Sequence, residues 1–259
     1  MLKEVKRAIA SRPAATRLVF LSDYDGTLAE FHHDPTIPRP SAKMRDLLRR
    51  LASRSDISSG IVSGRRVADL RTRTQLPGRV YLAGLHGMEI EVGVRRWQHP
   101  DLEIAREQIR ALTERLEEVR GEVPGLLLED KHASVAVHVR GVEAGDREAA
   151  VARADACAAQ WVASGELRRL TGTFVVEFLP NVACHKGDAT LWITRDVEER
   201  SAQTAWVVFV GDDLTDEDAF QAIEHGVSVL VGSRPSAAMY QLGSTTEVAA
   251  LLSWLTRDA

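Results

Sequence analysis

The chain carries a short apolar run at residues 18–21, followed almost at once by the acidic turn Asp23-Tyr24-Asp25-Gly26-Thr27. An unbroken apolar run of this length predicts a strand that is buried on both faces, as strands are in a parallel sheet. The two acids then lie at the carboxyl end of that strand, where open α/β sheets bind their ligands. The feature predicts an α/β protein with a ligand site at this turn. On these five residues alone, a βα turn that uses Asp and Gly only for its backbone geometry is the alternative.

The two acids of this turn are candidates for different chemical roles. Strand alternation places Asp23 and Asp25 on one face, although Gly26 indicates that the chain is already turning. Carboxylates held so close repel each other unless a cation, a proton or an electrophile relieves them. Asp23 is therefore a candidate nucleophile and Asp25 a candidate proton donor. Thr27 and the N–H groups of the turn offer hydrogen bonds to an oxyanion.

Two later segments supply groups that suit a phosphate. The strand-like run at 57–62 ends in Ser63-Gly64-Arg65, which offers a hydroxyl, an exposed N–H and a guanidinium. His185-Lys186-Gly187-Asp188 opens a helical pattern, so Lys186 lies near a helix N-terminus. The helix dipole disfavours a cation there, and an anionic ligand would compensate.

An acidic segment, Gly211-Asp212-Asp213-Leu214-Thr215-Asp216-Glu217-Asp218, follows the apolar run at 206–210. Acids favour the first turn of a helix, and we expect Thr215 to be the N-cap, with Asp218 three residues on. That interpretation is sufficient for Glu217 and Asp218.

It does not explain Asp212 and Asp213, which precede the expected cap and lie at the strand end. Together with Asp23 they offer the hard oxygen ligands that Mg²⁺ requires. The sequence therefore predicts Mg²⁺ as the cofactor.

Between residues 101 and 180 the pattern changes to two helix-strand-strand repeats. The expected helices begin near Asp101 and Arg147, and Gly172 is expected to mark the turn between the last two strands. The expected strands of this segment are 126–130, 134–140, 167–171 and 174–179. We predict an α+β domain at 101–180, inserted into a core formed by residues 1–100 and 181–259.

Composition excludes several other classes of protein. The chain has 33 basic and 37 acidic residues among 259, a net charge of −4, which argues against a nucleic-acid partner. It contains no stretch of about 18 consecutive apolar residues, so neither a membrane span nor membrane binding is expected. With two cysteines a disulfide framework is not expected either. We expect a cytoplasmic protein.

Four segments in this order resemble the motifs of the haloacid dehalogenase superfamily of phosphotransferases. They are the acid-x-acid-Gly-Thr turn, the strand-ending Ser63, the single Lys186 and the Gly-Asp-Asp turn at 211–213. The resemblance spans residues 18 to about 220 and implies a Rossmann-like core with a parallel sheet, plus an inserted α+β cap domain that determines substrate specificity.

Within that superfamily the chain resembles the trehalose-6-phosphate phosphatases, over nearly its whole length. The stretches that carry this resemblance are 23–29, 62–65, 83–87, 129–131, 137–140, 176–180, 186–187 and 209–220. Two departures concern the sugar pocket: the family more often has Ser at the position of Leu85, and a Glu-Val-Arg-Pro-like segment where this chain has Glu177-Phe178-Leu179-Pro180.

The resemblance implies hydrolysis of trehalose 6-phosphate in two steps through an aspartyl-phosphate on Asp23. The implied catalytic residues are Asp23, Asp25 and Lys186, and the implied phosphate-binding residues are Thr27, Ser63, Gly64 and Lys186. The implied substrate contacts are Arg65, His86, Glu129, Lys131, Arg140 and Glu177. The implied metal ligands are Asp23, Asp25, Asp212 and Asp213, with Asp216 behind them.

Other interpretations stay open. From pattern alone Arg140 and Glu177 fit a solvent-facing position, and Glu129 and Lys131 fit an ion pair of small value. The core motifs do not name the sugar, so sucrose 6-phosphate, mannosyl-3-phosphoglycerate or the phosphate of a trehalose-like pseudo-disaccharide are alternative substrates. A phospho-accepting receiver module is usually shorter and lacks the second acid, and a non-catalytic sensor should have lost Asp23, Asp25 or Lys186. We expect a monomer that acts on a small sugar phosphate.

Overall fold

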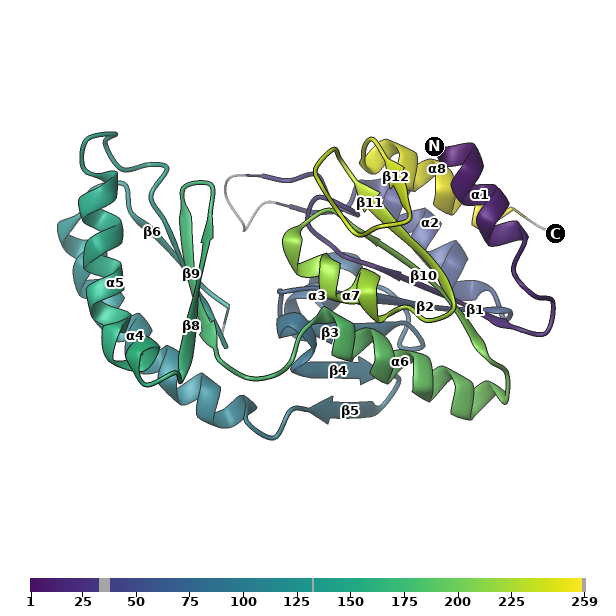
Figure 1. Ribbon diagram of the computed structural model, residues 1–259, viewed down its shortest axis with the longest axis horizontal. Coiled ribbons are helices and arrows are strands. Elements are labelled where there is room, and N and C mark those ends of the chain that lie inside the picture. Colours follow the sequence, from purple (N-terminus) through teal and green to yellow (C-terminus); the bar gives the residue numbers. More distant parts are fainter. Residues whose placement is uncertain (33–37, 132, 258–259) are drawn as a thin grey trace. The chain divides into compact units, whose positions relative to one another are not determined.

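A computed structural model describes residues 1–32, 38–131 and 133–257 of the chain (Figure 1). The chain folds into two compact units. The core unit consists of Met1–Trp97 and Cys184–Ala259, and the inserted unit consists of Gln98–Ala183.

In its described part, the core unit is built on one eight-stranded sheet in the order β12-β11-β10-β1-β2-β3-β4-β5. Strands β12 to β3 are parallel, and β4 runs antiparallel to β3. The strands are β1 (Arg17–Ser22), β2 (Ile57–Val62), β3 (Tyr81–Gly84), β4 (Glu89–Val92), β5 (Arg95–Gln98), β10 (Ala205–Gly211), β11 (Gly226–Val231) and β12 (Tyr240–Leu242). The mixed α/β architecture with a parallel sheet confirms the predicted fold class.

The central strand β1 is buried on both faces, as its apolar run predicts. Leu18 and Phe20 point into one apolar cluster, and Val19 and Leu21 point into another. Helices α1 (Leu2–Ala10), α2 (Ala42–Ser53), α3 (Val67–Thr74) and α8 (Thr245–Leu255) contribute to the first cluster, and α6 (Lys186–Ser201) and α7 (Glu217–Ala222) to the second. Two layers of helices therefore cover the sheet, which leaves the ends of its strands for function.

The inserted unit has a four-stranded antiparallel sheet in the order β6-β7-β9-β8 (Figure 1). Its strands are β6 (Leu127–Asp130), β7 (Val135–His138), β8 (Leu167–Gly172) and β9 (Val175–Pro180), and its helices are α4 (Leu102–Glu122) and α5 (Arg147–Ala163). Residues at steps of three and four on α4, such as Ile109, Leu112 and Leu116, pack with Val135 and Val137. The helices thus cover one face of this sheet.

The turn between β8 and β9 differs from the prediction. Gly172 is the last residue of β8 and pairs with Val175, so the turn is formed by Thr173 and Phe174. Phe174, not Gly172, has the left-handed backbone, with φ of 62°. The register of the hairpin decides this, because a glycine that is paired in the ladder cannot also form the turn.

Among the described helices, none is both long and apolar enough to cross a bilayer.

Candidate active site

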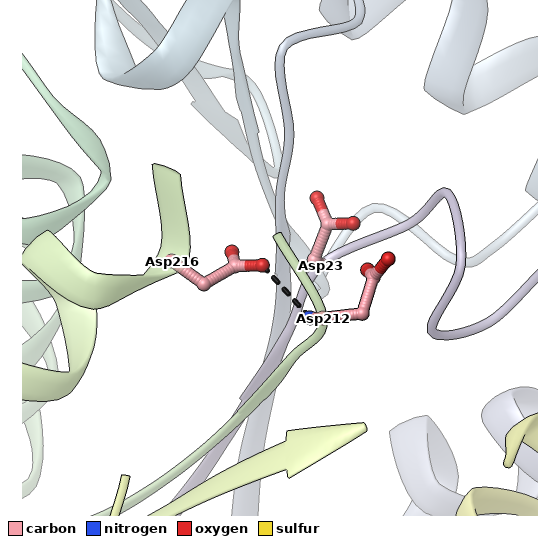
Figure 2. A group of neighbouring side chains, drawn as sticks. All are labelled: Asp23, Asp212 and Asp216. Atoms are coloured by element: carbon pink, nitrogen blue, oxygen red, sulfur yellow. Dashed lines mark hydrogen bonds between the residues drawn. The ribbon is translucent and has the colours of Figure 1, made fainter. Parts of the chain in front are cut away.

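The site forms where β1, β10 and β2 end side by side in the sheet. Because these strands are parallel neighbours, the turns that follow them meet at one edge. The N–H of Asp23 donates to Val210 O at 2.8 Å, and Thr27 Oγ1 donates to Asp212 Oδ1 at 3.1 Å. Residues far apart in the sequence are thus held together, as Figure 2 shows for Asp23, Asp212 and Asp216.

Lys186 connects two of these acids from the start of α6. Its Nζ donates to Asp23 Oδ1 and to Asp216 Oδ1, each at 2.7 Å, and its side chain is 3% exposed. Burial alone would lower the pKa of Lys186, but the charges of Asp216 and Asp23 raise it overall. Lys186 therefore remains a cation inside the protein, as its expected role requires.

Asp216 organises the acidic segment. Its Oδ2 accepts from the N–H groups of Asp212 and Asp213, at 2.9 Å each, while Oδ1 accepts from Lys186. Both carboxylate oxygens are thus engaged in holding the loop against the lysine. The predicted place of Asp216 behind the metal ligands stays a prediction.

The N-cap predicted for the helix of this segment is wrong by one residue, because α7 begins at Glu217 and its N-cap is Asp216, not Thr215. Asp213 caps the short helix η2 (Leu214–Asp216), and Asp216 completes the capping box. Thr215 lies inside η2 instead. The exposed side chain of Asp213 accepts the N–H of Asp216, so its predicted role as a metal ligand stays a prediction.

The acids at this edge fit a hard divalent cation. Carboxylate oxygens of Asp23, Asp212 and Asp216 all lie within 4.8 Å of one another. Burial, which outweighs Lys186, raises the pKa of Asp23, and the charges of Asp216 and Asp212 add to it. Burial followed by the charge of Asp216 raises the pKa of Asp212 to about 7. Such repulsion is relieved by a cation, and oxygen donors suit Mg²⁺.

Asp25 has a different surrounding from the other acids. Arg65 Nε donates to Asp25 Oδ2 at 2.6 Å and Arg65 Nη2 to Asp25 Oδ1 at 2.7 Å. Arg65 Nη1 also donates to Asp69 at 3.0 Å. Arg65, which is predicted to touch substrate, is 8% exposed, and its guanidinium is bonded to the predicted proton donor, Asp25. Metal binding by the Asp25 side chain and substrate binding by Arg65 stay predictions.

The turn after β2 brings Ser63, Gly64 and His86 together. Ser63 is buried, and its Oγ accepts from the N–H of Arg65 at 3.2 Å. The N–H of His86 donates to Ser63 O at 3.0 Å, and His86 has a left-handed backbone with φ of 58°. A Cβ on Gly64 would lie 2.7 Å from His86 Nε2, so a larger residue there would displace the His86 ring.

Gly26 serves a purpose that turn chemistry alone did not indicate. It has φ of 75°, and a Cβ there would lie 2.0 Å from Asp212 Oδ2. Any larger residue would push the Asp212 carboxylate away from the Asp23 turn.

The remaining predicted residues lie on the inserted unit, and Glu129 and Glu177 lie on the sheet face that the helices leave uncovered. Glu129, Ala136 and Glu177 are cross-strand neighbours in one row. Lys131 Nζ is 3.0 Å from Glu177 Oε1, which also accepts from Ser134 Oγ at 2.8 Å. Lys131, which follows β6, thus pairs with Glu177 of β9, and β7 lies between these two strands in the sheet.

Two contacts on this unit complete the picture. Glu129 Oε2 lies 3.1 Å from His138 Nε2, a residue that the sequence did not single out. The Arg140 guanidinium lies over the Phe174 ring, with its central carbon 4.8 Å from the ring centroid. The acids, Lys131 and His138 form a polar face that we call the carboxylate face, defined as Glu129, Lys131, Ser134, His138 and Glu177.

Fold and site together define a class of protein. A haloacid dehalogenase-like hydrolase from Bacteroides thetaiotaomicron has the same fold, with a TM-score of 0.63 at 16% identity over 93% of this chain and 99% of that one. The chain belongs to the trehalose-phosphatase family, whose family model matches residues 21–246.

Relatives within that family are similar over most of this chain. A trehalose-phosphate phosphatase of Mycobacterium avium (strain 104) is 35% identical over 237 residues, which cover 88% of this chain and 59% of the relative. The chain therefore spans about three fifths of that relative's length. The C-terminal domain of the Candida albicans trehalose-6-phosphate phosphatase has a TM-score of 0.78 at 22% identity, with 98% of this chain and 95% of that domain covered.

Proposed function

We propose that this protein hydrolyses trehalose 6-phosphate to trehalose and phosphate. The observation that carries the proposal is the buried Asp23–Lys186–Asp216 arrangement beside Asp212, in a chain of the trehalose-phosphatase family. A non-catalytic sensor would not need to keep a buried carboxylate and a buried lysine in contact.

In the first step, Asp23 attacks phosphorus and the bond from phosphorus to the sugar oxygen breaks. Lys186 holds Oδ1 of Asp23, so Oδ2 is the attacking oxygen. Asp25 gives a proton to the departing oxygen, and trehalose leaves. In the second step water attacks the aspartyl-phosphate, Asp25 takes its proton, and phosphate leaves with the Asp23 carboxylate restored.

Stabilisation of the phosphoryl charge falls to groups around this turn. Lys186 supplies one fixed cation, and the Ser63 hydroxyl, the N–H of Gly64 and Thr27 supply hydrogen bonds. Asp23 and Asp212 would hold Mg²⁺, with Asp216 positioning the loop behind them. When bound, that ion supplies positive charge that stabilises the transferring phosphoryl group.

Recognition of the sugar falls to the carboxylate face together with Arg140, and His86 is the core residue that we expect to touch substrate. Paired carboxylates and an ammonium suit the hydroxyls of a disaccharide, because charged groups make strong hydrogen bonds. Phosphates of sucrose, mannosylglycerate or a pseudo-disaccharide stay the alternatives. A monomeric, cytoplasmic protein without a nucleic-acid or membrane partner stays a prediction.

The test is phosphate release from a panel of sugar phosphates, with and without Mg²⁺, by the unsubstituted protein and by Asp23→Asn. We expect Asp23→Asn to abolish turnover, because an amide cannot form the acyl phosphate. Asp56→Asn is the control, since Asp56 pairs with Arg54 ahead of β2, at the other end of the strand.

Mg²⁺-dependent release that persists in Asp23→Asn would refute the nucleophile. If trehalose 6-phosphate ranked no better than glucose 6-phosphate, the proposed substrate would be wrong.

A further inference from the structure

One arginine outside every predicted motif holds the acidic segment from behind. Arg234 lies in the loop between β11 and β12, and β11 is the parallel neighbour of β10. Its Nε donates to Asp212 O at 2.9 Å, and its Nη2 donates to Asp213 O at 2.5 Å. One rigid guanidinium thus fixes two successive carbonyls of the segment that carries Asp212.

The same guanidinium is neutralised by a second contact with this segment. Arg234 Nη1 lies 2.5 Å from Glu217 Oε1, and both side chains are largely buried, at 23% and 19% exposure. Glu217 Oε2 accepts the N–H of Ala237 at 2.8 Å, from the same loop as Arg234. Four contacts therefore join the loop between β11 and β12 to the acidic segment. Two are made with the carbonyls of Asp212 and Asp213, and two with the carboxylate oxygens of Glu217.

We propose that Arg234 is a positioning residue for the divalent cation, acting through the main chain of Asp212 and Asp213. Asp216 holds the N–H groups of these two residues from one side, and Arg234 holds their carbonyls from the other. Together they set the direction in which the Asp212 carboxylate points. The inference rests on the proposed Mg²⁺ site.

The charge of Arg234 and its positioning of Asp212 have opposite effects on Mg²⁺ affinity, which allows the inference to be tested. A guanidinium bonded to the main chain of Asp212 repels a cation held by its side chain, so loss of charge alone would tighten Mg²⁺ binding. Loss of positioning would weaken it, because groups that orient metal ligands typically contribute about 10- to 100-fold in affinity. The sign of the change separates the two effects.

The experiment measures the Kd of Mg²⁺ by calorimetry for the unsubstituted protein, Arg234→Ala and Arg234→Lys, without substrate. We expect the Kd to rise about 10- to 100-fold in Arg234→Ala. Arg234→Lys keeps the positive charge but loses the planar guanidinium that bonds to both carbonyls, so the Kd of Mg²⁺ should rise in this variant as well. Hydrogen exchange of the amides at 212–217, measured without Mg²⁺, should become faster in both variants.

Arg54→Ala is the matched control. Like Arg234, Arg54 donates both to a carboxylate, that of Asp56, and to a main-chain carbonyl, that of Arg257. Its Kd should equal that of the unsubstituted protein. Arg234→Lys covers the case in which Arg234→Ala does not fold, because it keeps the positive charge and removes only the paired bonds to the two carbonyls.

An unchanged or tighter Kd in Arg234→Ala, or in Arg234→Lys where Arg234→Ala does not fold, overturns the inference and leaves the proposed phosphatase intact. If the unsubstituted protein binds no Mg²⁺, the metal site and this inference both fail.

Discussion

At the scale of single residues, the two hydrogen bonds from Arg65 fix the orientation of Asp25, the proposed proton donor. Both oxygens of Asp25 accept from one guanidinium, which Asp69 in turn anchors. Such a bidentate pair fixes the orientation of a carboxylate more tightly than a single contact does. In this structure Arg65 therefore orients the Asp25 carboxylate, in addition to any contact that it makes with substrate.

We expect Arg65→Lys to lower kcat by up to about 100-fold with a smaller change in KM, because misplacing a catalytic group by about 1 Å has that effect. Steady-state kinetics with trehalose 6-phosphate measure both constants. Arg73→Lys is the control, since Arg73 Nε also pairs with Asp69, at 2.6 Å, through the Asp69 oxygen that Arg65 does not contact. Equal kcat values in the two variants would contradict the positioning role of Arg65.

At the scale of elements, the four-stranded sheet of the inserted unit works as a platform with two different faces. Val135 and Val137 face the helices, while Ala136 and its cross-strand neighbours Glu129 and Glu177 lie on the other face. Strand alternation alone produces this division, as the sequence predicts. A shift of one residue in the pairing of a strand would move its side chains to the opposite face. The pairing register of this sheet must therefore be well defined.

We expect Glu177→Gln to lower kcat/KM for trehalose 6-phosphate by about 10- to 100-fold, because hydrogen bonds to charged groups contribute about 1.5–3 kcal/mol. The loss for p-nitrophenyl phosphate, which has no sugar, should be much smaller. Glu166→Gln is the control on the same unit, since Glu166 bonds to Gln108 and Ser164. Parallel losses on both substrates would show that Glu177 does not recognise the sugar.

At the scale of the whole molecule, the acids of the core unit link stability to pH and to metal. Burial and the charge of Asp216 raise the pKa of Asp212 from 3.8 to about 7, so the folded state binds a proton that the unfolded state has lost. The free energy of unfolding therefore falls, through this group, as pH rises from about 4 to about 7. We expect Mg²⁺ to compete with that proton and to reverse the trend.

We expect the rise in Tm caused by Mg²⁺ to be larger near pH 8 than near pH 5.5, with the apparent affinity changing about tenfold per pH unit below pH 7. Thermal unfolding with and without Mg²⁺ at several pH values measures this. In Asp212→Asn the pH dependence of the Mg²⁺ effect should be strongly reduced. A Mg²⁺ effect that is independent of pH in the unsubstituted protein would exclude Asp212 as a ligand that must lose a proton.

The sequence by itself determined where the strands lie, although some of their ends differ from the prediction, as in β7. The run at 18–21 is apolar without interruption, and β1 is buried on both faces; the alternation in 134–140 yields β7, with its valines in the core. These features depend on neighbours in the chain, which a pattern records.

Only the tertiary structure decided which charged groups meet. Arg65 holds Asp25, Lys131 pairs with Glu177, and Arg234 reaches the carbonyls of Asp212 and Asp213 from 22 and 21 positions away in the chain. The cause is geometric: strand order and loop packing set the distances between these side chains, and a charged residue carries no local pattern that names its partner.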